Sequence, residues 1–389
     1  MNRLGLFLTT AIVLLIAACG GKTGAPPTGG LAAPARESDD PQARWAKTLD
    51  AAKQEGKVVV VTHTNLYYQK EIEKFGEKYP DIPVEQVSMR PSEFTPKVIT
   101  EQQNGIYGYD VWVSPTSNMV ETVVPAGGFE SLIPYLILPE VTDSTQYRGG
   151  KPLYVSSEPY VMAYQGNVTT NVWVNRDLLP ASEFNTLDQL VDPKLKGKIA
   201  IRTPSAPHAG SLTLTGLLHN KGQAFLDQLL IDQQPVFIDN ARLMTQDLIN
   251  GKYPVAIGID GETMDACQRE GGCKSMQQLT GYEYMLSYGV GILKNPPHPN
   301  AAAVFLNWFL SKEGQQAFVQ SVEATTPPPY DQAQSIRVDV DPNPDAIKDQ
   351  AMPDYDHLEK YSLQGMEAGR PEMQAVLAAY KKVEESGGR

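Results

Sequence analysis

The chain has 389 residues, 41% of them hydrophobic, and a formal net charge of −12. This length is sufficient for two domains with cores of their own. The acidic balance, with no basic cluster to offset it, argues against nucleic acid as a partner. Beyond the N-terminal segment, the sequence contains no apolar run long enough to predict a membrane-spanning helix.

The N-terminal segment has the pattern of an export signal. Arg3 precedes an almost entirely apolar run, Leu4 to Ala18, which is too short for a comfortable membrane span. The run ends in Ile16-Ala17-Ala18-Cys19, and small residues before a Cys resemble the bacterial lipobox, in which that Cys carries lipid. We predict a lipoprotein signal peptide at 1–18 and a lipid anchor at Cys19; an ordinary signal peptide with an incidental Cys is the alternative. Residues 19–40, rich in Gly, Ala and Pro, predict a flexible tether.

Two further cysteines, Cys267 and Cys273, are separated by a short loop that contains two glycines. Disulfides persist in the compartments that exported proteins enter, so we predict a structural disulfide between this pair. A thiolate metal site is the alternative, although no histidine lies nearby in the sequence.

Helices and strands alternate in the first part of the fold. The predicted strands are 57–62, 84–87 and 109–113, and the predicted helices are 41–54, one from about 66 to 79, and 91–103. The continuous β-branched run in Lys57–Thr62 is typical of a strand buried on both faces of a parallel sheet. This alternation predicts βαβ units.

Polar residues follow two of these strands. Ligands bind beyond the carboxyl ends of the strands in open α/β sheets. We therefore expect a cleft lined by Thr64, Asn65, Ser114, Thr116 and Ser117. Ordinary loop and cap chemistry is the alternative for such residues.

The pattern weakens between Gly127 and Pro159, where prolines, glycines and short apolar runs predict a surface excursion. Extended chain is expected again from Tyr160 to Val174. Thr186 then precedes a short apolar-periodic stretch and is expected to cap a helix.

A second α/β set follows. Its predicted strands are 198–202, 235–238 and 254–259, and its predicted helices are 212–218, 223–230 and one that Asp239 or Asn240 caps. The loop 203–211 presents backbone N–H groups before a helix, which favours an anionic or polar ligand group. The candidate residues there are Ser205, Gly210 and Ser211, with simple helix capping as the alternative. Asp260-Gly261-Glu262 follows the last strand.

One late unit organises the rest of the chain. A strand is predicted over 282–293, and a Pro-rich turn follows it. Apolar residues then recur at three- and four-residue spacing from Ala301 to Phe309, which predicts a helix with one apolar face. Ser311 is expected to cap a second helix from about 313 to 319. Such a unit often returns to an earlier domain. A C-terminal helix is predicted near 373–383.

The sequence contains few signs of catalysis. Its five histidines are scattered, and none forms an HExxH pair or another zinc-binding spacing. There is no Gly-x-Ser-x-Gly elbow and no Gly-x-Gly-x-x-Gly after a strand. We therefore do not predict an enzyme.

An ordered set of motifs carries a family resemblance over roughly residues 50–330. The lipobox and tether are followed by VVVVTHTN, KFGEKYPDIPVE, ITEQQNGIYGYDVWVS, VWVNRDLL, LVDPKLKGKI and KNPPHPNAAAVFLNWFLSKEGQQAF. Together they resemble the extracellular solute-binding proteins of ABC importers, and most of all the ferric-iron and related-solute branch with the type II periplasmic-binding-protein fold.

That resemblance implies an α/β protein with two lobes on either side of a ligand cleft. Lobe 1 would comprise 41–160 and 286–335, lobe 2 would comprise 161–285, and 336–389 would pack on lobe 2. The chain would cross between the lobes near Glu158–Val172 and Tyr284–Gly291, and ligand would close them by a hinge motion.

The implied function is capture of a small solute, either iron or a related metal or a small polar organic molecule, and its delivery to an ABC permease. The protein would be exported, lipid-anchored to a membrane through Cys19, monomeric, and free of any cofactor besides the transported ligand. A secreted two-lobed α/β hydrolase or transferase is the alternative.

The ligand set departs from that of the ferric-binding members. They use an adjacent Tyr pair after the strand that here is Pro254–Ile259, whereas this chain has Asp260-Gly261-Glu262. Its Tyr67-Tyr68 pair lies at a position that does not match. The oxygens of Asp260 and Glu262 suit a hard cation. They equally suit an ammonium or hydroxyl group of an organic solute. A third interpretation is that one or both residues cap the following helix.

Overall fold

The computed structural model describes residues 40–64, 66–152, 154–156, 158–168, 171–205, 209–259, 264, 267, 273–279, 285–325, 335–341 and 363–385. Every described residue belongs to one compact unit within Leu31–Arg389. The predicted signal peptide and the lipidation site at Cys19 lie outside the described residues. Among the helices in these ranges, none is both long and apolar enough to cross a membrane.

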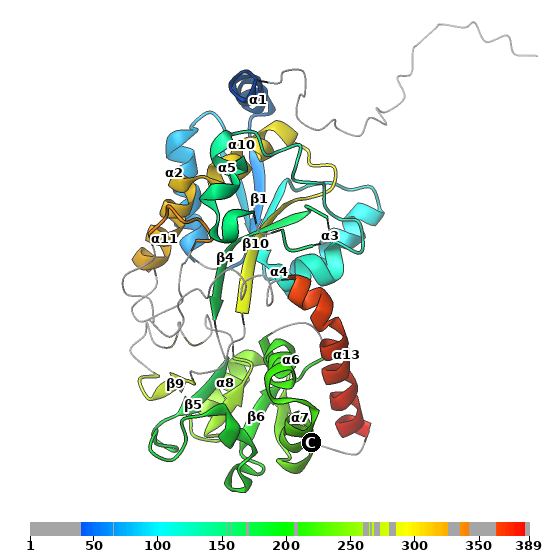
Figure 1. Cartoon of the computed structure of the whole chain (residues 1–389), viewed down its shortest axis with the longest axis vertical. Coiled ribbons are helices and arrows are strands. Elements are labelled where there is room, and N and C mark those ends of the chain that lie inside the picture. Colours follow the sequence, from blue (N-terminus) through cyan, green and yellow to red (C-terminus); the bar gives the residue numbers. More distant parts are fainter. Residues whose placement is uncertain are drawn as a thin grey trace, which may run out of the picture. The chain divides into compact units, whose positions relative to one another are not determined.

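Sheet 1 has the strand order β2-β1-β3-β10-β4, and its strands β1, β10 and β4 are labelled in Figure 1. Its strands are β1 (Val58–Thr62), β2 (Val84–Ser88), β3 (Val111–Pro115), β4 (Val161–Val168) and β10 (Met285–Ile292). β1 pairs parallel with β2 and β3, while β10 runs antiparallel to both β3 and β4. All five residues of β1 are buried, as its β-branched run predicts. The late strand thus returns to the first sheet and lies in its interior.

Sheet 2 repeats this arrangement with the order β7-β6-β8-β5-β9. Its strands are β5 (Val172–Asn175), β6 (Ile199–Arg202), β7 (Val236–Ile238), β8 (Val255–Ile257) and β9 (Met276–Gln278). β6 pairs parallel with β7 and β8, and β5 is antiparallel to β8 and β9. Each sheet therefore has three parallel strands, then one antiparallel strand, and then a fifth strand that again runs in the direction of the first three.

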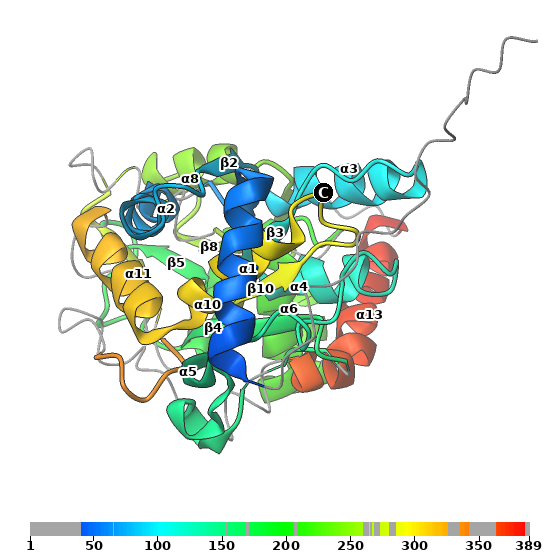
Figure 2. The same ribbon diagram turned by 90° about the horizontal axis from the view of Figure 1, so that it is seen from above.

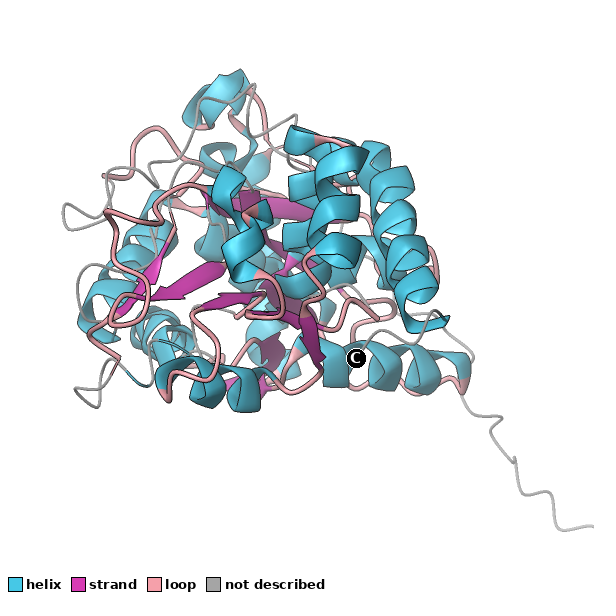
Figure 3. Cartoon of the chain, turned by 90° about the horizontal axis from the view of Figure 1, so that it is seen from below, coloured by secondary structure: helices cyan, strands magenta, loops and turns pink. Residues whose placement is uncertain are grey.

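Helices flank both sheets, and the strands lie between them (Figure 3). Along sheet 1 these are α1 (Pro41–Glu55), α2 (Leu66–Lys78), α3 (Pro91–Gln103), α10 (Pro299–Leu310) and α11 (Lys312–Thr325). α1 contacts α10, and α2 contacts α11 (Figure 2). Along sheet 2 the helices are α6 (Ala209–Lys221), α7 (Gln223–Asp227), α8 (Ala241–Ile249) and α13 (Leu363–Glu385). The shorter α4 (Thr116–Asn118) follows β3, and α5 (Pro139–Thr142) precedes β4.

The predicted caps are present at several helix ends. The Thr186 side chain and Gln189 form a capping box at the short helix Leu187–Val191. Asn240, rather than Asp239, caps α8 by accepting from the backbone N–H of Leu243 at 3.1 Å. The Ser311 hydroxyl accepts from the backbone N–H of Gly314 at 3.1 Å at the start of α11.

The prediction of one apolar face for α10 is wrong, because nearly the whole helix is buried. Helix α10 packs against α1, α11 and β1 at once. Phe75 of α2 adds ring contacts to Phe305 and Trp308, with centroids 5.2 and 5.3 Å apart. A helix surrounded on all sides needs apolar residues all round.

The prediction of a surface excursion over 127–159 is also wrong, since this segment supplies buried core residues such as Leu132, Ile137 and Val141. Its irregular backbone is satisfied by Asn307 of α10. The Asn307 Oδ1 accepts from the backbone N–H groups of Ile137 and Leu138 at 2.9 Å each, and Nδ2 donates to the carbonyl of Tyr135 at 2.7 Å. Buried loops are tolerable when their backbone groups find such partners.

The chain passes from sheet 1 to sheet 2 between β4 and β5 and returns between β9 and β10. Strand β4 pairs with β10, so 161–168 lie in sheet 1, beyond the expected end of lobe 1 at residue 160. After α11, residues 335–341 also dock beside sheet 1: Ser335 bridges to Gln165 of β4, and Arg337 bridges to Tyr147 in the segment before β4. Only α13 of the described C-terminal residues contacts α6 of sheet 2. The lobe boundaries themselves stay a prediction.

Candidate functional site

The carboxyl edge of sheet 1 carries the residues that follow β1 and β3. Thr64 is exposed there, whereas Ser114 and Thr116 are buried. Strand β10 causes part of this burial: Ser114 pairs with Gly289, and a Cβ on Gly289 would lie 2.8 Å from Cγ2 of Thr116. Ser117 is buried too, and Asn65 lies outside the described residues. The predicted edge is thus present, but only Thr64 among its described candidate residues is exposed.

Local hydrogen bonds hold the end of β1 in place. The Gln86 side chain donates from Nε2 to Oγ1 of Thr62 at 2.8 Å, and the backbone N–H of Met89 donates to the Thr62 carbonyl at 3.0 Å. Both partners come from β2 and the residue after it, so the edge of β1 is tied to its neighbour. The loop that starts at His63 therefore leaves a rigid strand end.

The carboxyl edge of sheet 2 brings the end of β8 against the start of α6. Gly258 has φ of +94°, and a Cβ at this position would lie 2.5 Å from Cα of Gly210. Only glycine permits both the positive φ and this approach. Ser205 is exposed on the same edge, whereas Gly210 and Ser211 are buried and already have interaction partners.

Asp260 and Glu262, the strongest ligand candidates from sequence, lie outside the described residues. The strand that leads to them is well anchored. The Trp173 indole donates from Nε1 to the carbonyl of Ile259 at 3.1 Å. This contact fixes the last described residue before Asp260 to the neighbouring strand β5.

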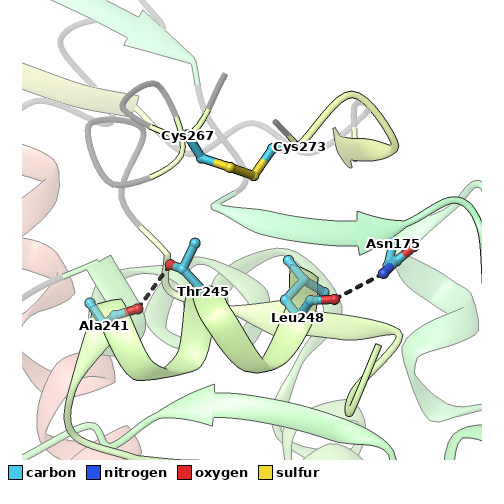
Figure 4. The surroundings of a disulfide bond; sticks show 6 residues. All are labelled: Asn175, Ala241, Thr245, Leu248, Cys267 and Cys273. Atoms are coloured by element: carbon cyan, nitrogen blue, oxygen red, sulfur yellow. Dashed lines mark hydrogen bonds between the residues drawn. A yellow bond between two sulfur atoms is a disulfide. The ribbon is translucent and has the colours of Figure 1, made fainter. Parts of the chain in front are cut away.

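The predicted disulfide between Cys267 and Cys273 is formed, with the two Cα atoms 5.8 Å apart (Figure 4). Cys273 is buried in an apolar cluster that includes Met244 and Leu248 of α8. Asn175 of β5 donates from Nδ2 to the Leu248 carbonyl at 2.9 Å, which ties α8 to β5 (Figure 4). The disulfide closes a short loop between β8 and β9, and Cys267 lies five residues after Glu262 in the sequence.

A buried polar cluster between α2 and β4 was not predicted. The hydroxyls of Tyr68 in α2 and Tyr164 in β4 are 2.8 Å apart. Glu71, one helical turn from Tyr68, is 1% exposed, and burial raises its pKa well above the ordinary value. Burial likewise raises the pKa of Tyr164. The spacing of Tyr68 and Glu71 on the inward face of α2 was the only signal in the sequence.

Within the described ranges, no group of three or more His, Cys, Asp or Glu side chains is arranged to hold a metal ion. Asp110 and His298 form one acid–imidazole pair, with Oδ2 and Nδ1 2.9 Å apart. That pair lies at the start of β3, and Asp110 also accepts from the backbone of Val59 and of His298. Its hydrogen bonds join β1, β3 and α10, which is a structural role.

Comparison with known proteins decides the family. A family model for bacterial extracellular solute-binding proteins matches residues 62–316, more than half of the chain. The chain belongs to this family. The members of this family are solute-binding proteins.

Several solved structures have the same fold. Iron-bound HitA from Pseudomonas aeruginosa matches with a TM-score of 0.60 at 16% identity, covering 84% of this chain and 99% of HitA. FutA from Trichodesmium, in complex with iron and citrate, matches with 0.59 at 14%, covering 86% and 100%. AfuA from Actinobacillus pleuropneumoniae, with fructose-6-phosphate bound, matches with 0.58 at 19%, covering 85% and 98%. A search of curated protein sequences gave no match. The predicted architecture of the periplasmic binding proteins is confirmed.

Proposed function

We propose that this solute-binding protein is the substrate-binding receptor of an ABC importer. Family membership carries the proposal. The two sheets support it, because they share one strand order and the chain passes between them at β4–β5 and again at β9–β10. Open α/β sheets bind ligands beyond the carboxyl ends of their parallel strands. A solute held between two such edges can draw two lobes together by hinge closure.

The hinge would lie in the two connections between the sheets. β4 ends at Val168 and β5 starts at Val172, while β9 ends at Gln278 and β10 starts at Met285. Asn171 in the first connection has φ of +47°, a conformation that Asn adopts more readily than most residues. Short connections at two neighbouring points define an axis, so the proposed motion is a rotation of lobe 2 against lobe 1.

The solute is proposed to be small and polar. The similar structures contain different ligands: iron in HitA, iron and citrate in FutA, and fructose-6-phosphate in AfuA. In this chain, Thr64 and Ser205 offer hydroxyls at the two edges. Asp260 and Glu262 would add carboxylate oxygens for a hard cation, an ammonium group or hydroxyls. Direct Fe³⁺ binding by two adjacent tyrosinates is not proposed, because the Tyr68 hydroxyl is already bonded to Tyr164 inside the core.

The receptor would act outside the cytoplasm as a monomer. Cys19 would carry the lipid anchor, and residues 19–40 would tether the folded protein to the membrane near its permease. No cofactor besides the transported ligand is proposed. Incorporation of radiolabelled fatty acid into the wild type but not into Cys19→Ser would test the anchor. Equal labelling of both would contradict it.

Binding is tested by thermal shift and titration calorimetry against metals, ferric citrate, sugar phosphates, phosphonates, polyamines and thiamine. A true ligand at one hundred times its Kd should stabilise the protein by about 2.7 kcal/mol. Asp260→Asn and Glu262→Gln should weaken that binding without lowering stability. Asp232→Asn, an exposed acid at the end of the π-helical segment Gln228–Asp232 before β7, is the matched control. No response to any panel member would count against the receptor, and lower stability with unchanged affinity would make the two acids helix caps.

A further inference from the structure

We propose that the C-terminal helix α13 is a strap that joins the two sheets across their carboxyl edges and limits how far the lobes open. The inference rests on the proposed two-lobed receptor and adds a structural element to its hinge. It depends on three sets of contacts: those of residues 335–341, those of α13 with sheet 2, and those of α13 with α4.

Residues 335–341, named here the docking segment, are fixed to sheet 1. The backbone N–H of Ile336 donates to the carbonyl of Tyr164 in β4 at 3.0 Å. Arg337 is 1% exposed and makes a bidentate pair with Asp339, at 2.8 and 2.9 Å. Its Nη1 also donates to the carbonyls of Glu140 and Leu310 at 3.1 and 3.0 Å. A buried guanidinium with all these partners holds the segment firmly.

Helix α13 is fixed to sheet 2 by one apolar seam. Val376, Ala379, Tyr380 and Val383 recur at three- and four-residue spacing, and Val376 and Val383 belong to the apolar core that includes Leu212 and Leu217 of α6. The Tyr380 ring packs edge-on against Phe237 of β7, with centroids 4.8 Å apart. The chain therefore leaves sheet 1 after residue 341 and is bound to sheet 2 by residue 376. This is a third covalent link between the sheets.

The strap also touches both candidate ligand edges. Helix α13 packs along α6, which starts at Ala209 after the loop that follows β6 on the carboxyl edge of sheet 2. Helix α13 also contacts α4, which starts at Thr116 on the carboxyl edge of sheet 1. Figures 1 and 2 both show α13 running beside α6 and α4 and away from β4 and β10, which lead into the hinge connections.

Its position gives α13 a mechanical role. Rotation about the hinge connections moves points far from the axis more than points near it. The contacts of α13 with α4 and α6 lie away from the axis, so opening the lobes has to separate α13 from one of its partners. The resting, ligand-free protein should therefore be held in a narrow range of lobe separations.

The test measures lobe separation directly, without any ligand. Spin labels at Asp50→Cys in α1 and Lys196→Cys before β6, both exposed positions, report the distance between the sheets in a full chain with Cys19→Ser. Val376→Asp removes α13 from its apolar seam. Ala378→Asp places the same charge on the exposed face of the same helix and is the control. Double electron–electron resonance should give a longer and broader distance distribution for Val376→Asp than for the doubly labelled protein without this change. Ala378→Asp should leave the distance distribution unchanged.

Hydrogen exchange of α13 shows whether the helix has undocked. Faster exchange of α13 in Val376→Asp with an unchanged distance distribution would overturn the strap. If Val376→Asp fails to fold, Tyr380→Ala replaces it, since this change removes the ring contact with Phe237 of β7. If no solute in the panel binds the wild-type protein, the receptor function is contradicted, but the measured distances between the spin labels are unaffected. The two proposals can therefore fail independently.

Discussion

Asn307 should be one of the most sensitive positions in the scaffold. Its side chain is fully buried and bonds to four backbone groups: it accepts from Ile137 and Leu138, and it donates to Tyr135 and to Ala303. Asn307→Leu keeps the volume approximately but removes all four bonds. The Ala303 carbonyl lies within α10 and is expected to keep a helical partner, whereas two N–H groups and the Tyr135 carbonyl lose theirs.

The magnitude follows from those three groups. Each buried unsatisfied backbone group costs about 1–3 kcal/mol. Leu138 is only partly buried, so water can reach its N–H group. We therefore expect Asn307→Leu to lower the free energy of unfolding by about 3–5 kcal/mol.

Urea unfolding followed by tryptophan fluorescence measures the change, because the buried Trp308 is the next residue in α10. Asn220→Leu, an exposed Asn on α6, is the matched control and should change stability by less than about 0.5 kcal/mol. A loss below about 1 kcal/mol for Asn307→Leu would refute the view that this side chain organises the 127–159 segment.

Three further substitutions test the buried acid on α2, the close contact at Gly258 and the disulfide. Burial raises the pKa of Glu71 in the folded state above its ordinary value of 4.5, so the stability that protonated Glu71 contributes is complete below pH 4.5 and is lost as the pH rises. Glu71→Gln should therefore raise the Tm more at pH 8 than at pH 4. A Tm difference that does not change with pH would contradict this. Gly258→Ala should cost roughly 2–4 kcal/mol in urea unfolding, because its Cβ would overlap Gly210, and a neutral effect would remove the proposed close contact. Cys267→Ser should lower stability by about 2 kcal/mol without changing ligand affinity; reduced affinity alone would give the disulfide a binding role.

Features with a local cause could be predicted from the sequence. The β-branched run of β1 needs only its own residues to specify a doubly buried strand. The capping box at Thr186 depends on Gln189, three residues away. The disulfide and the return of β10 to sheet 1 also followed from spacing and order along the chain.

Features with a distant cause could not. The burial of 127–159 depends on Asn307, which is about 170 residues away in the sequence. The pair Tyr68–Tyr164 joins residues 96 apart, and no periodicity connects them. At the candidate site, the strand ends located the edge of sheet 1, but the packing of Gly289 on Thr116 decided which hydroxyls are buried.

The most direct test of the central claim is a crystal structure of the protein purified from its native export pathway without unfolding. Density for a small polar solute is expected between the carboxyl edges of the two sheets, within hydrogen-bond distance of residues such as Thr64, Ser205, Asp260 or Glu262. The same solute should raise the Tm when added back. Side chains of the protein filling the space between those edges, together with no solute response in the panel, would contradict the receptor function.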